Sequence, residues 1–228
     1  MEITTPFSSS STTENGGTVS TKVRLKSAPL SPVTITLNSS DTQEGTVSPT
    51  VLTFNKDNWD SYVSIIVTGV DDDIADGSQS YEIQITSVVS EDSKYSALNG
   101  QINPIKLQNE DDEIKAIVLG SLSGDTTEAG GNATFSVKLA SKPIEAVSIP
   151  IISTDTSEGT VNVSSLSFDN SNYNTVQIVT VNGEDDDERD GNIAYQVKIG
   201  PTSSNSLPYN SVESLTHSIT NIDNETSG

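Results

Sequence analysis

The chain has 228 residues, which suits two domains of about 100–120 residues each better than a single small one. It carries 32 acidic and 11 basic residues, and the formal net charge of −21 argues against binding to nucleic acid or to an anionic membrane, since both require positive charge. No cysteine occurs, which excludes disulfides, zinc–thiolate sites and a thiol nucleophile. No run of about 18 apolar residues occurs either, so the sequence predicts no membrane insertion.

Apolar and polar residues alternate along short segments in the first half of the chain, a pattern typical of half-buried β-strands. In chain order, the predicted strands are 19–25, 33–37, 64–68, 81–85 and 105–107. Turn-forming residues separate them, and no stretch sustains the 3.6-residue apolar period of a helix. This half is therefore predicted to form an antiparallel β-sandwich of the immunoglobulin type.

Acidic residues gather in alternate loops between these predicted strands. Four carboxylates lie in the segment Asp71-Asp72-Asp73-Ile74-Ala75-Asp76, directly after the strand 64–68. Glu14 precedes the first strand, Asp41 follows the second, and Asp111 and Asp112 follow the last. Successive loops of a sandwich alternate between its ends, so these carboxylates are expected to meet at one rim. Carboxylates this close repel one another and need water, a basic partner or a metal ion.

The second half of the chain repeats the first. The segment Asp41-Thr42-Gln43-Glu44-Gly45 returns as Asp155-Thr156-Ser157-Glu158-Gly159, and Asp71-Asp72-Asp73 returns as Asp185-Asp186-Asp187. The strands predicted here are 133–139, 147–149, 177–181 and 195–199. We therefore predict an all-β protein made of two tandem immunoglobulin-like antiparallel β-sandwiches, with module 1 at residues 1–113 and module 2 at residues 114–228.

The run from Val67 to Asp76, which leads into Tyr81-Glu82-Ile83, resembles the signature of Calx-β domains, as does the closing pair Asp111-Asp112. The resemblance implies a sandwich whose loops bind Ca²⁺. The ligands that it implies in module 1 are Glu14, Asp41, Asp71, Asp72, the carbonyl of Ile74, Asp76, Asp111 and Asp112. Those that it implies in module 2 are Glu128, Asp155, Asp185, Asp186, the carbonyl of Glu188, Asp190 and Asp223.

The chain departs from the family pattern in two places. The family usually has glutamate where this chain has Asp76 and Asp190, which shortens the reach of these side chains by one methylene group. Module 2 closes with Asp223-Asn224 rather than with two aspartates, so fewer or weaker ions are expected there. A solvated acidic rim without any ion remains the alternative to a calcium site.

The Ser/Thr-rich style of the sequence most resembles bacterial adhesin-type repeats. This implies a calcium-binding structural or adhesion module of a larger extracellular protein, either secreted or at the bacterial cell surface, forming a monomeric rod whose rim and interdomain hinge Ca²⁺ stiffens. A cell-surface protein or glycan is the further partner it implies. Two alternatives stay open: a glycan- or protein-binding module, and a calcium-sensing regulatory domain of a membrane transporter.

Features of other function classes are weak in this sequence. His217 is the single histidine, and no nucleophile–base pair is visible, so no enzyme is expected. Trp59 and Tyr173 occupy equivalent positions in the two copies, which favours packing over a sugar-stacking platform. The N-terminal segment Met1-Glu2-Ile3-Thr4-Thr5-Pro6 does not resemble a signal peptide, and both ends of the chain are expected to continue in a longer protein.

Overall fold

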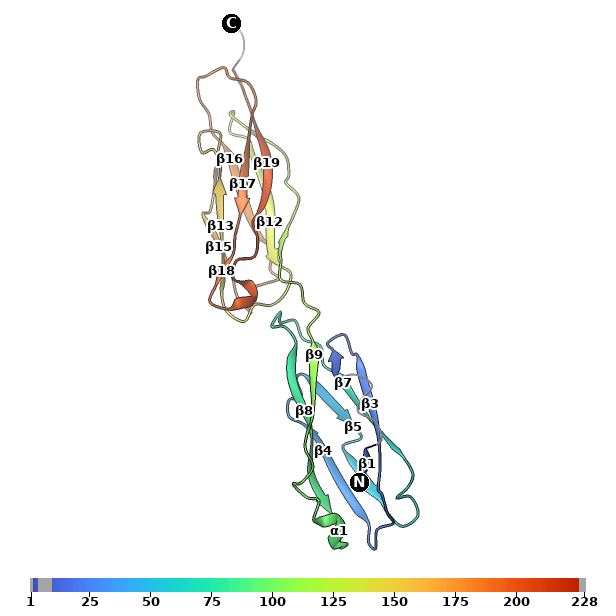
Figure 1. Cartoon of the computed structure of the whole chain (residues 1–228). Coiled ribbons are helices and arrows are strands. Elements are labelled where there is room, and N and C mark those ends of the chain that lie inside the picture. Colours follow the sequence, from blue (N-terminus) through green and yellow to red (C-terminus); the bar gives the residue numbers. More distant parts are fainter. Residues whose placement is uncertain (1, 4–9, 226–228) are drawn as a thin grey trace. The chain divides into compact units, whose positions relative to one another are not determined.

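The computed structural model of the chain describes residues 2–3 and 10–225. Met1 and residues 4–9, at the start of predicted module 1, and residues 226–228, at the end of predicted module 2, lie outside the described residues. Contacts divide the chain into two compact units, which are Met1–Asp72 with Asp76–Asp112, and Asp73–Ala75 with Glu113–Gly228. Strands dominate each unit (Figure 1), and the predicted all-β class with two sandwich-like units is confirmed.

Two sheets form the first unit, and alternation of apolar and polar residues explains most of their strands. The first sheet has the order β1-β3-β7-β5, with β1 (Glu2–Ile3), β3 (Thr18–Arg24), β7 (Val63–Gly69) and β5 (Gly45–Ser48). The second has the order β2-β9-β8-β4-β6, with β2 (Ser11–Thr13), β9 (Ile105–Glu110), β8 (Gln79–Val89), β4 (Val33–Ser39) and β6 (Val51–Phe54). Neighbouring strands are antiparallel except β2 and β9, which run parallel.

The core of the first unit lies between these sheets. Every second residue of β3 is buried, and across the β3–β7 pair Val19 lies opposite Val67 and Thr21 lies opposite Ile65. Such β-branched side chains pack well on a pleated sheet. They explain how a chain with only 5% aromatic residues forms a buried hydrophobic core. Trp59 is half-buried against this core, as expected of a packing residue.

The second unit repeats the design. One sheet has the order β10-β12-β16-β14, with β10 (Ile117–Leu119), β12 (Asn132–Leu139), β16 (Gln177–Gly183) and β14 (Gly159–Val161). The other has the order β11-β19-β17-β13-β15, with β11 (Thr126–Thr127), β19 (Leu215–Ile222), β17 (Ile193–Ile199), β13 (Val147–Ser153) and β15 (Ser165–Phe168), and β18 (Ser203–Ser204) pairs with β13. Again the pair formed by the earliest and latest strands, β11 and β19, is parallel.

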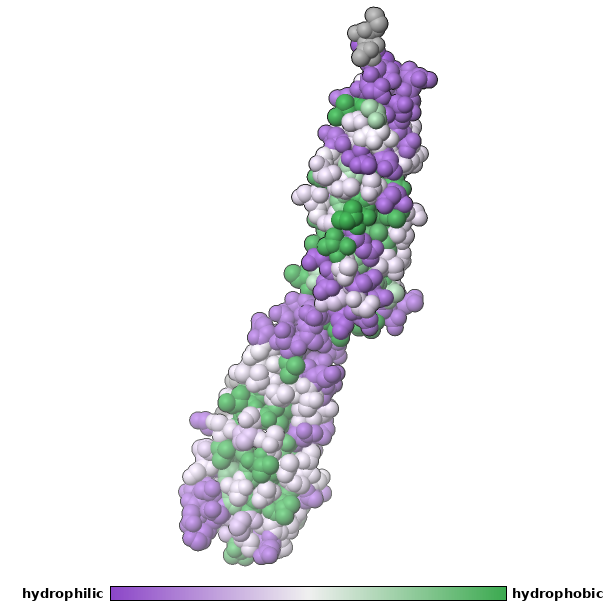
Figure 2. All heavy atoms as spheres, turned by 180° about the vertical axis from the view of Figure 1, so that it is seen from behind, coloured by the Kyte–Doolittle hydropathy of each residue, from purple (hydrophilic) through white to green (hydrophobic). Residues whose placement is uncertain are grey.

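Among the described residues, helical structure is confined to one short turn in each unit, α1 (Ser93–Ser96) and the 3₁₀ turn Leu207–Tyr209. Asp92 caps α1 by accepting from the Lys94 N–H over 3.0 Å. Within residues 2–3 and 10–225, no helix is long and apolar enough to cross a membrane. The face of the chain shown in Figure 2 carries patches of hydrophobic residues among hydrophilic ones.

Candidate metal centre

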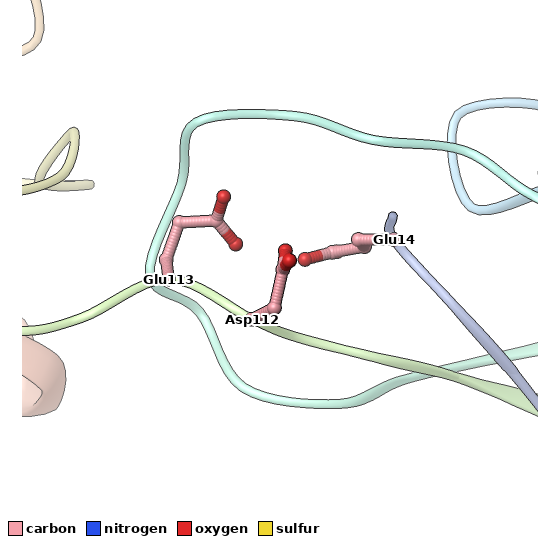
Figure 3. Close-up of side chains that lie close together, drawn as sticks. All are labelled: Glu14, Asp112 and Glu113. Atoms are coloured by element: carbon pink, nitrogen blue, oxygen red, sulfur yellow. The ribbon is translucent and has the colours of Figure 1, made fainter. Parts of the chain in front are cut away.

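Acidic side chains meet at the end of the first unit where the parallel strands β2 and β9 finish. The pairing continues past the strands, because the Glu14 N–H donates to the Glu110 carbonyl oxygen over 3.0 Å. This register brings Glu14 to Asp112 and Glu113, and one carboxylate oxygen of each residue lies within 4.8 Å of the others (Figure 3). Glu14 is only 3% exposed, so its charge has lost most of its water. We call these three residues the first strand-end cluster.

The second strand-end cluster consists of Glu128, Asp223 and Glu225, whose ligand atoms also lie within 4.8 Å of one another. Its backbone frame is the same, since the Glu128 N–H donates to the Ile222 carbonyl oxygen over 3.1 Å. Asn224 stands where the first unit has Asp112. The Asn224 side chain donates to Asp185 over 2.9 Å, and its backbone N–H donates to Glu128 over 3.1 Å. An amide donor therefore replaces one carboxylate in this unit.

Glu225 bears the clearest electrostatic cost in the second cluster. Its hydrogen bond with Asp223, its burial and the nearby Glu128 carboxylate raise the pKa of Glu225 to about 7. The pKa of Asp223 is lowered instead, chiefly because the Glu225 N–H donates to it over 2.7 Å, and the charge of Arg189 adds to this effect. Glu225 Oε2 is buried and has no hydrogen-bond partner. A cation in contact with this oxygen would remove the cost of burying it unpaired.

A further group of carboxylates, which we call the loop cluster, comes from loops that lie far from the strand-end residues in the sequence. In the second unit it consists of Glu158, Asp186 and Asp190, again with ligand atoms within 4.8 Å of one another. Glu158 is 6% exposed, and burial is the main cause that raises its pKa, with the charges of Asp190 and Asp186 contributing. Asp186 and Asp190 are exposed, whereas Glu158 is buried. Carboxylates that lie this close together favour either a proton or a metal ion.

The corresponding residues in the first unit are Glu44, Asp72 and Asp76. Burial raises the pKa of Glu44, and the neighbouring charges of Asp76, Asp41 and Asp72 raise it further. The pKa of Asp76 is raised mainly by burial as well, with Asp72 and Asp111 adding to the shift. These mutual effects show that the carboxylates of three loops influence one another at this rim.

In each unit, the aspartate that follows the last strand (β9 or β19) also holds the end of the acidic loop. Asp111 accepts a hydrogen bond from the Gly77 N–H, and Asp223 accepts one from the Gly191 N–H over 2.9 Å. Both glycines have φ of +79°, a left-handed conformation that residues with a Cβ rarely adopt. The Asp-Gly pair that ends each acidic run is thus explained by backbone geometry.

Three residues predicted as ligands in the first unit lie outside both groups. Asp41 accepts a hydrogen bond from the Gln43 N–H over 2.9 Å and is exposed. Asp71 is exposed too. Ile74 belongs to the piece Asp73–Ala75 that the contacts assign to the second unit. The remaining predicted ligands of module 1 are in, or interact with, the two clusters described above.

In the second unit, Asp155, Asp185 and Glu188 lie outside the clusters. Asp155 is capped by Ser157, whose side-chain hydroxyl and backbone N–H hydrogen-bond to it and lower its pKa. Asp185 accepts from the Asn224 amide. Glu188 is exposed, and its N–H donates to Asp186 over 2.6 Å.

Sequence reasoning missed four acidic residues that the structure brings into these groups, namely Glu44, Glu113, Glu158 and Glu225. A usable signal existed for Glu44 and Glu158, because both occupy the same place in the repeated Asp-Thr-x-Glu-Gly segment. Glu113 and Glu225 likewise follow the closing acidic pair at matching positions. All donors of the clusters are oxygen atoms, which suits hard cations such as Ca²⁺ and Mg²⁺ and not thiol-seeking metals.

Comparison with known proteins yields structural likeness only. No family model and no curated protein matches the chain. Among solved structures, the calcium binding domain CBD12 of CALX1.1 is 12% identical with a TM-score of 0.35, covering 89% of this chain and 80% of that one. Domains 4 and 5 of the S-layer protein SbsC are 13% identical with a TM-score of 0.34, covering 83% and 75%. The CupB2 chaperone of Pseudomonas aeruginosa is 10% identical with a TM-score of 0.33, covering 96% and 98%. Likeness at this level carries no argument about the site.

Proposed function

We propose that the chain is a calcium-binding structural protein made of two Calx-β-like units, in which bound ions join strand ends and loops at the rim of each unit. The observation that carries this proposal is the second strand-end cluster. There, three carboxylates lie within 4.8 Å of one another, and Glu225 Oε2 is buried without a hydrogen-bond partner. The cluster around Glu14 supports it, because Glu14 and Glu113 match Glu128 and Glu225 in the repeat, while the third acid is Asp112 in one unit and Asp223 in the other.

Calcium fits these donors better than magnesium does. Ca²⁺ accepts six to eight oxygen ligands in flexible geometry, whereas Mg²⁺ demands near-ideal octahedral geometry and keeps several of its waters. The rim supplies carboxylates from at least three loops that lie far apart in the sequence, which is a multidentate set. Glu14, Asp112 and Glu113 would hold an ion in the first unit, and Glu128, Asp223 and Glu225 would hold one in the second.

A bound ion would have a mechanical role here, because it would cross-link parts of the chain. Without it the clustered carboxylates repel, and with it they become cross-links between segments that are distant in sequence. Asp112 ends the last stretch of the first unit, and Glu113 follows it directly in the sequence. An ion held by these two consecutive residues would restrict the backbone between them, so stiffening of the interdomain hinge is part of the proposal.

The wider setting that we infer is a larger extracellular protein of the bacterial surface or a secreted one. Extracellular calcium modules bind Ca²⁺ with dissociation constants of about 10⁻⁴–10⁻³ M. Affinity in this range does not require optimal ligands, so the aspartates Asp76 and Asp190 would suffice in place of glutamates. Trp59 and Tyr173 pack against the cores of their units, so neither forms a platform for sugars. A structural role in spacing or adhesion is therefore favoured over glycan recognition and over catalysis.

Calcium titration of the full chain, followed by calorimetry and by thermal melting, tests the proposal. The wild-type chain should bind Ca²⁺ saturably and more tightly than Mg²⁺, and saturating Ca²⁺ at about 100 times the dissociation constant should add about 2.7 kcal/mol of stability. Glu14→Gln and Glu128→Gln should each weaken binding at one rim by at least tenfold, on the order expected for loss of a buried ligand charge.

Glu91→Gln is the matched control, because Glu91 is exposed and lies near α1, beyond the far end of β8 from the acidic loop. This variant should bind calcium like the wild type. The proposal is refuted if the wild-type chain shows neither saturable binding up to about 10 mM Ca²⁺, well above the range of extracellular modules, nor a rise in melting temperature.

A further inference from the structure

A buried carboxamide lies beneath the acidic loop of the first unit. Asn109, on the last strand β9, is 0% exposed. Its Nδ2 donates to the Val70 carbonyl oxygen over 2.8 Å and reaches Glu44 Oε2 at 3.5 Å. Val70 is the residue between the end of β7 and Asp71, so Asn109 contacts both the start of the acidic loop and the half-buried carboxylate of Glu44.

The same arrangement recurs in the second unit. Asn221 on β19 is 1% exposed, and its Nδ2 donates to the Glu184 carbonyl oxygen over 2.9 Å. It also reaches Glu158 Oε2 at 3.5 Å. Glu184 precedes the acidic run in the same way that Val70 does. Two diverged copies thus place an amide donor on the same two targets, which argues against accidental filling of the core.

A buried hydroxyl group contacts the asparagine in the first unit but not in the second. In the first unit, the Thr12 hydroxyl donates to Asn109 Oδ1 over 3.0 Å and lies 2.9 Å from the Tyr81 hydroxyl. In the second unit, the Thr126 and Tyr195 hydroxyls pair over 3.0 Å, and Asn221 Oδ1 has no hydrogen-bond partner. The contacts of Nδ2 are therefore the ones that both units share.

An apolar side chain would fill this space at lower cost, since a buried amide must recover its desolvation through hydrogen bonds. A carboxamide nitrogen carries two hydrogens, which lets it bind a carbonyl oxygen and a carboxylate together.

We propose that Asn109 and Asn221 are positioning residues that hold the start of the acidic loop and the glutamate of the loop cluster in place before a cation arrives. The ion itself rests on the calcium function proposed above, whereas the positioning concerns the ion-free chain and stands independently. Binding at a site that is already ordered avoids the cost of ordering the loop.

Hydrogen exchange of the full chain in chelator tests the positioning. Asn109→Leu removes both donors and keeps the volume, and amides of residues 70–78 should exchange about tenfold faster, as expected for loss of a buried hydrogen bond. Tyr95→Phe is the matched control. It removes a buried hydroxyl that donates to the Ser27 carbonyl oxygen over 2.6 Å beside α1, so it should leave the exchange of residues 70–78 unchanged.

A second variant covers the case in which Asn109→Leu does not fold. Asn109→Asp is isosteric and keeps an acceptor for Thr12 but cannot donate to Val70, so it should accelerate the same amides. The positioning proposal is overturned if the folded variants exchange in residues 70–78 no faster than Tyr95→Phe does.

Calcium titration of the same variants separates the two proposals. Binding at the first unit should weaken about tenfold in Asn109→Leu and remain at the wild-type value in Tyr95→Phe. Wild-type affinity in Asn109→Leu, despite a loosened loop, would overturn the role of the amide in cation binding. Absence of calcium binding by the wild-type chain would refute the proposed function, and the exchange experiment would still decide the positioning.

Discussion

Replacing Gly183 with alanine should destabilise the second unit by about 2–4 kcal/mol. A Cβ at this position would lie 2.7 Å from Asn221 Oδ1 and would overlap the Thr127 carbonyl oxygen, where ordinary contact begins at 3.4 Å. Backbone atoms cannot move as cheaply as the end of a flexible side chain, and overpacking of this kind costs about 1–3 kcal/mol. The Thr127 oxygen also accepts from the Gly130 and Gly131 N–H groups over 3.0 and 3.2 Å, and weakening these bonds adds about 1 kcal/mol.

Differential scanning calorimetry of the full chain is a suitable assay. At roughly 4 °C per kcal/mol for a unit of this size, the transition of the second unit should fall by about 8–16 °C. Gly124→Ala is the matched control, because a Cβ there meets nothing within 4 Å, and it should melt within about 2 °C of the wild type. If Gly183→Ala and Gly124→Ala melt alike, the close approach of Thr127 and Asn221 to this glycine does not constrain the fold.

Two further predictions concern pH and capping. The pKa of Glu225 is about 7 in the folded chain and near 4.5 when unfolded, and the pKa values of Glu44, Asp76 and Glu158 are raised too, so the folded state binds more protons. In the presence of a chelator, the melting temperature should therefore rise as the pH falls from 8 to 5, and it should rise less in Glu225→Gln. A melting temperature that falls over this pH range would contradict the raised pKa values. Asp92→Ala removes the acceptor of the Lys94 and Leu30 N–H groups, which lie at 3.0 and 2.9 Å. It should lower the free energy of unfolding, measured by urea denaturation, by about 1–2 kcal/mol. Lys94→Ala, at an exposed position, is the control and should lower it by less than about 0.5 kcal/mol.

The long strands were predictable because each has one face on the core and one on solvent. The alternation at 64–68 marks β7, and that at 133–139 marks β12. The strand β2 was missed because its sequence, Ser11-Thr12-Thr13, contains no apolar residue. Thr12 is nevertheless 1% exposed and is held by hydroxyl contacts with Tyr81 and Asn109, which only the tertiary structure reveals.

The candidate site was predictable at the level of loops but not of individual oxygen atoms. The order of the strands correctly predicts that Glu14 lies near the residues after the last strand, because Glu14 follows β2 and those residues follow its parallel partner β9. The same reasoning treats every acid of a loop alike, although Asp71 is exposed and Asp72 influences Glu44. Which carboxylate turns inward depends on the path of the loop, and sequence periodicity does not encode it. The division into modules at residues 1–113 and 114–228 stays a prediction.

The parallel pairing of β2 with β9, and of β11 with β19, determines how each unit would respond to tension. When the two ends of a chain segment are pulled apart, parallel neighbours slide along one another, so their hydrogen bonds are sheared together rather than opened one at a time. Resistance to forced unfolding is governed by the unfolding rate, and shear geometry makes that step slow. Glu14 follows β2 and Asp112 follows β9, so an ion bound between these two side chains would tie the ends of the two strands together.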